Sequence, residues 1–299
     1  VSSQTSSGYK TVDRIYTNAS GSTYNQSQQT VTVGGETGLP TQFTKFLRHD
    51  VTTSNDNAHF YHKIEDVASV PAGTVTLSFY AKGVTPTGGL SFRAYQNFGT
   101  GGSPSGEVSI TISDTVTLTS TWQRFSFNIT VPSITGKTLG TNGNDTFYFG
   151  IGQFANTSTN AYQLDITGLQ LEVGTEATPF EHRSFGQELA LCQRYYELIG
   201  AGQPAKANSA TAIWCGMQFK TEKRASPSMS LTAANQRFFE FGIANRDASS
   251  ASIGATYLNT KSVLIMVDGF SSLTAGNIFL SGGLVSDTTA NTFIADSEL

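Results

Sequence analysis

Apolar and polar residues alternate along most of the chain in short runs. In the clearest run, residues 74–81, the side chains of Val75, Leu77, Phe79 and Ala81 share one face and the intervening side chains share the other. A spacing of two is the period of a β-strand with one buried face. We therefore predict a strand over residues 74–81.

Further strand-like runs extend from the beginning of the chain to residue 171. Clusters of Gly, Asn, Ser and Pro separate them, and no helical pattern lies between them. This arrangement indicates an antiparallel sandwich or barrel, and about ten strands suit a two-sheet jelly-roll. The runs are 14–16, 29–33, 42–48, 60–64, 90–95, 108–112, 122–129, 147–151 and 164–171.

A single helical pattern follows. Ser184 and Gln187 have the spacing of a capping box, and residues 188–198 have helical apolar spacing. Gly200 and Gly202 suit its end. We predict a connecting segment over residues 184–202, with its helix over 184–198.

The apolar arc of this helix is wide, which leaves two interpretations open. The helix is either a linker that packs on its own sandwich or an oligomer contact, with a threefold arrangement favoured. The second interpretation places Leu189, Cys192, Tyr195 and Tyr196 at the contact.

Strand-like runs return after residue 203. They predict a second, smaller β-sandwich, so the chain is expected to have domains at 1–183 and 203–299 joined by 184–202. The runs are 212–220, 228–232, 238–243, 255–259, 263–267, 278–280 and 292–295.

Charge is scarce. Only 13% of residues are charged, the net charge is −4, and Lys and Arg form no run, whereas a typical soluble domain is about 25% charged. Nucleic-acid binding and a polybasic membrane patch both need a basic footprint, so we expect neither. No apolar stretch reaches the length of a membrane span. Cys192 and Cys215 are expected as two thiols, with a bridge between them as the alternative.

Two groups of side chains suit the recognition of sugars, which combines an aromatic ring with amides or charged groups. One group precedes the glycine-rich stretch 99–106 and the other surrounds the run 147–151. As the alternative, the tyrosines are half-buried sheet residues and the amides form turns. The candidates are Arg93, Tyr95, Gln96 and Asn97, and then Tyr148, Gln153, Asn156 and Tyr162.

Metal and catalytic motifs are weak. His59 and His62, near Glu65 and Asp66, have ligand types, but a spacing of three on a strand places the two imidazoles on opposite faces. Glu65 and Asp66 are also the one adjacent acidic pair, and neighbouring strand residues point apart. The sequence has no serine-hydrolase elbow, phosphate loop or dinucleotide fingerprint. We expect no enzymatic activity and no cofactor.

Several blocks resemble phage and prophage structural proteins of the tail-fibre or head-fibre type, with a jelly-roll like that of carbohydrate-binding modules. The resemblance covers about residues 1–198, and the blocks are 6–9, 75–82, 96–105, 122–125, 132–143, 169–174, 177–183 and 191–196. The ending 295–299 also resembles the C-terminus of such proteins. By analogy with carbohydrate-binding jelly-rolls, Asp165 is the position of a structural calcium. The family supplies no catalytic residue.

The resemblance implies a bacteriophage virion protein on the extracellular face of the particle. Its partners would be other virion proteins, further copies of itself (a trimer being favoured) and a host-surface glycan. Two alternatives stay open, a purely architectural connector that binds no sugar and a capsule depolymerase.

Overall fold

The protein is described by a computed structural model. The structure describes residues 5–9, 15–18, 20–53, 57–86, 89–154, 161–232, 236–243, 245–248, 250–282 and 293–298. The chain divides into two compact units, residues 1–182 and residues 183–298, and both consist almost entirely of antiparallel strands. The predicted all-β class is therefore confirmed. In the described part of the chain no helix is long and apolar enough to cross a membrane.

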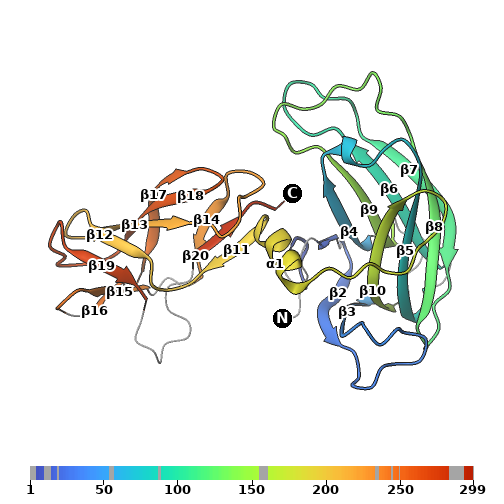
Figure 1. The fold of residues 1–299 in the computed structure, drawn as a ribbon, viewed down its shortest axis with the longest axis horizontal. Helices are drawn as coiled ribbons and strands as arrows, with labels where there is room; N and C mark the ends of the chain where they lie inside the picture. The colour runs from blue at the N-terminus through green and yellow to red at the C-terminus, as the bar shows by residue number, and fades with distance from the viewer. Residues whose placement is uncertain are drawn as a thin grey trace. The chain divides into compact units, whose positions relative to one another are not determined.

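The first unit is a sandwich of two five-stranded sheets (Figure 1). In spatial order the first sheet contains β1 (Ile15–Asn18), β4 (Ala58–Glu65), β9 (Thr146–Gln153), β6 (Leu90–Asn97) and β7 (Val108–Val116). The second contains β2 (Thr23–Thr30), β3 (Lys45–Thr53), β10 (Tyr162–Val173), β5 (Gly73–Val84) and β8 (Gln123–Val131). A short 3-10 helix, η1 (Val67–Ser69), follows β4.

Inward-facing side chains of both sheets form the main core. Leu77 and Phe79 of β5 are fully buried there, as the alternation predicts. Phe79 meets Phe92 of the other sheet with ring centroids 5.6 Å apart, and Phe92 meets Phe127 at 4.6 Å. Aromatic burial between the sheets therefore holds the sandwich together.

A second, smaller core lies on the outer face of the β2–β8 sheet, where residues 31–44 cross it. Phe43 packs on Tyr80 and Phe180 at ring distances of 5.3 and 5.2 Å. Val31 and Phe43 are thus buried in a loop, because their side chains cover the sheet. The predicted strands at 29–33 and 42–48 overlap β2 and β3 but have the wrong bounds, since β2 ends at Thr30 and β3 begins at Lys45.

Glu36 fastens this loop to the sheet. Its carboxylate accepts hydrogen bonds from Nζ of Lys82 and, at 2.8 Å, from Nε1 of Trp122. The Lys82 bond is the main cause that lowers the pKa of Glu36 to about 2. The outer face of the second sheet is consequently covered by the chain itself.

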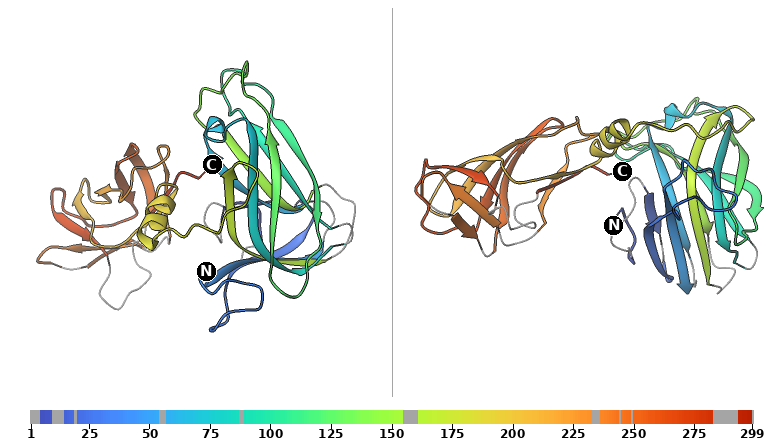
Figure 2. Two further views of the ribbon diagram at one scale, coloured as in Figure 1. Left: turned by 45° about the vertical axis from the view of Figure 1, so that its right-hand side comes forward. Right: turned by 60° about the horizontal axis from the view of Figure 1, so that its bottom comes forward.

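The second unit contains a three-stranded sheet and a seven-stranded sheet, which can be followed by colour in Figure 2. The small sheet contains β11 (Tyr196–Ile199), β20 (Phe293–Asp296) and β14 (Ser228–Leu231). The large one contains, in spatial order, β16 (Asn245–Ala248), β15 (Gln236–Glu240), β19 (Ile278–Ser281), β12 (Pro204–Ala207), β13 (Ala212–Gln218), β18 (Ser262–Asp268) and β17 (Ser252–Leu258).

The predicted helix is shorter than expected. The capping box of Ser184 and Gln187 is present, but α1 (Phe185–Gln193) stops before Tyr195. The chain then enters β11, which pairs with β20. Tyr195 is buried, whereas Tyr196 is partly exposed on a strand. The predicted helical face is therefore wrong beyond Gln193, because pairing with β20 overrides the local helical pattern.

The two cysteines are free thiols. Cys192 is half-buried on α1, and Cys215 is buried on β13. Burial raises the pKa of the Cys215 thiol to about 12. The expectation of two thiols agrees with this arrangement.

A buried ion pair lies where α1 ends and β11 begins. Nζ of Lys223 lies 2.7 Å from Oε2 of Glu197, both side chains are almost fully buried, and Nζ also donates to the carbonyl of Gln193, the last residue of α1. Burial is the main cause that lowers the pKa of Lys223, and the bond to Glu197 opposes it. The pair thus joins β11 to the loop that carries Lys223.

The core of the first unit contains a buried histidine. His49 of β3 lies among the rings of Tyr24, Phe60 and Tyr162, and its Nδ1 is 3.1 Å from Oε1 of Gln26. Burial, with a smaller effect of His59, lowers the pKa of His49 to about 3. The neutral imidazole is therefore the form that the fold accommodates.

We predict that His49 makes the first unit acid-sensitive. In the unfolded chain its pKa is about 6.5, so stability is complete above that pH and falls by about 1.4 kcal/mol per pH unit as the pH drops toward 3. Denaturant unfolding of wild type and His49→Gln at a series of pH values measures this. The advantage of wild type over His49→Gln in unfolding free energy should shrink steadily below pH 6.5. A difference that stays constant with pH would contradict the prediction that protonation of His49 destabilises the fold.

We predict that Lys223→Met destabilises the second unit by about 3 kcal/mol, because it leaves the Glu197 carboxylate buried without its counter-ion. The double variant Lys223→Met with Glu197→Leu should recover most of that loss, since no buried charge remains. Thermal unfolding of the three proteins tests this. An equal loss of unfolding free energy in the single and double variants would show that the destabilisation comes from packing and not from the unpaired charge.

Candidate functional site

The outer face of the β1–β7 sheet carries a cluster of rings. Alternation turns Phe60 of β4 and Phe149 of β9 into the core, so their neighbours Tyr61 and Tyr148 point outward. The cluster is called the aromatic face and consists of His59, Tyr61, Arg93, Tyr95, Tyr148 and Phe154.

Three tyrosines form the centre of the aromatic face. Tyr95 and Tyr148 are opposite each other on β6 and β9, and their rings stack at 4.6 Å with an interplanar angle of 17°. Tyr61 stands nearly perpendicular to Tyr148, at 5.1 Å and 88°. Burial is the first cause that raises the pKa of both Tyr61 and Tyr148. The phenols are therefore neutral hydrogen-bonding groups at physiological pH.

A glycine makes room for the other rings. Gly150 lies opposite both Tyr61 and Arg93, and a Cβ there would come within 2.7 Å of the rings of Phe154 and Tyr61. Phe154 also stacks on His59 at 4.1 Å, and the guanidinium of Arg93 lies 5.0 Å from the Phe154 ring centre. Side chains from neighbouring strands thus close over the space above Gly150.

A carboxylate borders the rings. Oε2 of Glu107 accepts hydrogen bonds from the Tyr148 hydroxyl at 2.7 Å and from Nδ2 of Asn97 at 2.9 Å. Glu107 itself is exposed. It therefore presents a charged acceptor at the edge of the aromatic face while fixing the orientation of Tyr148.

The loops beside this edge are held to each other. The amide of Gly140 donates to the carbonyl of Phe98 at 2.7 Å, and the amide of Thr100 donates to Oδ1 of Asn144 at 2.8 Å. These bonds join residues 98–106 to residues 132–145. Because Glu107 follows the first of these loops, its position is supported from both.

The structure brings together four of the residues predicted to contact sugar. Arg93, Tyr95, Asn97 and Tyr148 all lie on the outer side of β6 and β9. Gln153 ends β9, where its carbonyl oxygen is 3.0 Å from Nδ1 of His59. Asn156 lies outside the described residues.

Two predicted contacts are wrong. Gln96 points inward and is buried, with its Nε2 donating to the carbonyl of Pro132 at 2.8 Å. Tyr162 is buried in the main core, and its hydroxyl donates to the carbonyl of Ala58. Each residue sits on the core side of its strand, so neither reaches the aromatic face.

Other members of the site were not predicted. His59 and Tyr61 flank the buried Phe60 on β4, so strand alternation would have predicted that both point outward. Phe154 and Glu107 lie just outside strands, so no alternation applies to them. Their contribution depends on three-dimensional proximity.

Asp165 does not fit the calcium expected from the resemblance. Its Oδ1 and Oδ2 are each 2.7 Å from a nitrogen of Arg48, and the carboxylate is fully buried on the outer face of the β2–β8 sheet. This ion pair raises the pKa of Arg48. Calcium needs six to eight oxygen ligands, whereas a guanidinium already neutralises this carboxylate.

The histidine pair does not form a metal site either. His62 points toward Phe149, with rings 5.5 Å apart, while His59 is on the opposite, outer side of β4. Across the described ranges, no three His, Cys, Asp or Glu side chains come close enough together to hold a metal ion.

Comparisons with known proteins find weak structural likenesses. No family model and no curated protein matches the chain. The enzymatically active domain of tailspike protein 4 from bacteriophage CBA120 is 16% identical with a TM-score of 0.29, over 50% of this chain and 19% of that one. This chain thus spans about a fifth of the tailspike chain.

Two carbohydrate-binding modules are also similar to this chain. A CBM4 structure is 15% identical with a TM-score of 0.22, over 52% of this chain and 87% of that one. The CBM22 tandem of Paenibacillus barcinonensis Xyn10C is 11% identical with a TM-score of 0.32, over 98% and 95%. At such TM-scores these likenesses carry no argument for a shared function.

We predict that the stability of the first unit depends on the Arg48–Asp165 pair and not on calcium. Asp165→Asn should lower the unfolding free energy by about 1–2 kcal/mol, because it weakens a charge-assisted bidentate contact of a half-exposed arginine. Neither a chelator nor added calcium should change the unfolding temperature of the wild type. A calcium-dependent rise that Asp165→Asn abolishes would restore the metal interpretation.

Proposed function

We propose that the first unit is a non-catalytic glycan-binding module and that its ligand lies on the aromatic face. A pyranose ring has an apolar face of C–H groups and a rim of hydroxyls. The rings of the aromatic face can pack against the C–H groups. The carboxylate of Glu107 and the guanidinium of Arg93 can bond the hydroxyls. A surface of this kind, mainly aromatic with a few fixed polar groups, is typical of small-ligand sites.

The observation that carries the proposal is the tethered tyrosine stack. Tyr148 is held between the parallel ring of Tyr95, the perpendicular ring of Tyr61 and the hydroxyl bond to Glu107. A side chain fixed in this way loses little further conformational freedom when a ligand binds. The contrast with the other sheet supports the assignment, because the chain's own residues 31–44 cover that sheet's outer face.

The arrangement of acidic groups favours binding over cleavage. Glycoside hydrolysis needs two carboxyl groups about 5–9.5 Å apart across one bond. Oε2 of Glu107 already accepts hydrogen bonds from the Tyr148 hydroxyl and from Nδ2 of Asn97. A carboxylate held in this way suits a fixed contact to a sugar hydroxyl, which supports binding as the proposed role of this face.

We further propose that the protein belongs to the exterior of a phage particle. The ordered sequence blocks that resemble fibre-type virion proteins support this placement, and so does a surface poor in charge and rich in hydroxyls and amides. Repeated copies on a particle would convert weak single-site sugar binding into firm attachment. Immunogold labelling of intact particles with an antibody against this chain tests the placement.

We predict that Tyr148→Ala and Tyr61→Ala each weaken glycan binding by about thirtyfold, equivalent to about 2 kcal/mol for a buried aromatic anchor. A glycan array identifies the ligand, and calorimetry then measures its affinity. Tyr80→Ala is the matched control, because Tyr80 lies on the covered face of the other sheet against Phe43. This variant should bind the glycan as wild type does. Unchanged binding by folded Tyr148→Ala would reject the site, and no binding to any glycan would favour the architectural alternative.

A further inference from the structure

The outer face of the seven-stranded sheet in the second unit carries large apolar side chains. Alternation buries Phe238 and Phe279 in the core, while Phe239 is 42% and Ile278 62% exposed. Phe241, directly after β15, is 53% exposed. Soluble monomers rarely leave a contiguous apolar surface of this kind uncovered.

Strand register joins these side chains into two rows. The first row runs across neighbouring strands, and its members are cross-strand partners or neighbours. They are Phe239, Leu280, Pro204, Gly216, Leu264 and Tyr257. On the second row, the consecutive partners are Ile278, Lys206, Trp214 and Met266. The rows cross six strands and contain one charged residue, Lys206.

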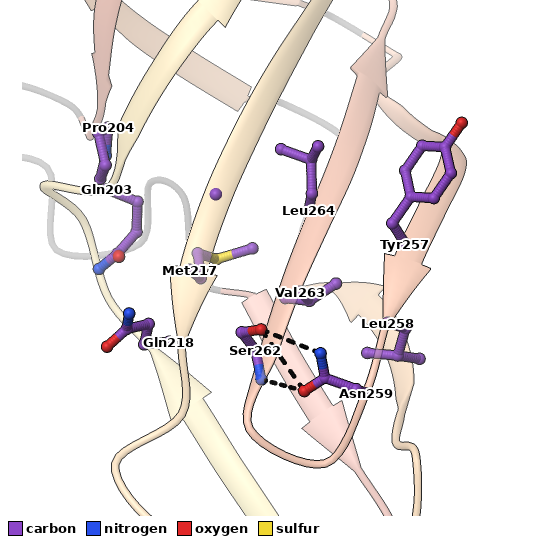
Figure 3. Close-up of a pocket in the computed structure, with 11 residues that line it drawn as sticks. Gln203, Pro204, Met217, Gln218, Tyr257, Leu258, Asn259, Ser262, Val263 and Leu264 are labelled. Carbon is purple, nitrogen blue, oxygen red and sulfur yellow. Dashed lines mark hydrogen bonds between the residues drawn. The ribbon is translucent and has the colours of Figure 1, made fainter.

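The face has a raised side and a hollow side. Phe239, Phe241 and Ile278 form a ridge over β15 and β19. A groove lies over β12, β13 and β18, and Figure 3 shows Gln203 and Pro204 on one side of it and Leu264 and Tyr257 on the other. Gly216 forms its floor, and a Cβ there would meet nothing closer than Leu264 at 3.8 Å.

We infer that a second copy of this chain docks on this face, with the ridge of each copy in the groove of the other. Ridge and groove lie on opposite sides of β12 within one sheet. A twofold axis parallel to the strands near β12 therefore brings each ridge over the partner's groove, which is the self-complementary contact that a symmetric dimer requires. Sheets packed in this way interdigitate their facing side chains.

The area and the chemistry both suit such a contact. Phe239, Phe241, Ile278, Leu264 and Tyr257 expose on the order of 600 Å² together, judged from the usual area of such side chains. Two copies would bury about twice that, at the lower end of stable protein interfaces. Aromatic and Met side chains with few charges are typical of interface centres. The groove also has four polar side chains, those of Gln203, Gln218, Asn259 and Ser262, which suit the polar rim of an interface.

Sedimentation of the full chain over the micromolar range tests the inference, which does not depend on the aromatic face. Wild type should reach the mass of two copies, and Leu264→Glu and Phe239→Lys should each weaken association by about a hundredfold. Leu189→Glu on α1 is the matched control, because Leu189 is about as exposed as Leu264, and it should associate as wild type does.

Mixing the variants tests the pairing itself. With the axis near β12, Phe239 on β15 of one copy faces Leu264 on β18 of the other, because both lie two strands from β12 on the same row. A Leu264→Glu chain and a Phe239→Lys chain therefore place opposite charges together at one contact and retain the native contact at the other, so the mixture should recover association. Circular dichroism confirms that each variant is folded. A monomeric wild type, loss of association in Leu189→Glu alone, or no recovery on mixing overturns the inference, and so does saturable glycan binding that Leu264→Glu removes without changing the mass.

Discussion

Successive side chains on a β-strand point to opposite faces, so a protein built from sheets must deal with twice as many faces as its cores can bury. This constraint organises both units. The main core of the first unit uses one face of each sheet, with Phe79 and Phe92 meeting between them. What happens on the remaining faces differs from sheet to sheet, and the proposed binding activities follow from that difference.

Three of the outer faces differ in what covers them or what they expose. Residues 31–44 cover one and fasten it through Glu36. The second keeps Tyr61, Tyr95 and Tyr148 in a rigid cluster with a polar edge. The third, on the seven-stranded sheet, carries aliphatic and aromatic side chains around a shallow groove. A tyrosine cluster with a charged edge suits a hydroxylated ligand, and a broad, mostly apolar face with a few polar groups suits another protein surface.

The sequence pattern predicts the class and most strands correctly because alternation is a local property. It places Leu77 and Phe79 in the core, and the same rule applied to β4 would have placed Tyr61 outward. It fails where a tertiary contact decides the outcome. Residues 196–198 have helical spacing, yet they lie in β11 because β20 offers a pairing partner and Lys223 offers a counter-ion to Glu197. Asp165 likewise finds Arg48, which is 117 residues away and invisible to any local pattern.

Gly150 limits which substitutions the aromatic face can accept, because two rings fill the space above its backbone. A side chain at this position would displace the rings of Phe154 and Tyr61 together, so a single mutation here would rearrange two members of the aromatic face at once. A substitution at Asn97 meets no such barrier, because this side chain lies beside Glu107 at the edge of the cluster. A change of ligand preference is therefore easier to reach by substitution at the polar edge than at Gly150.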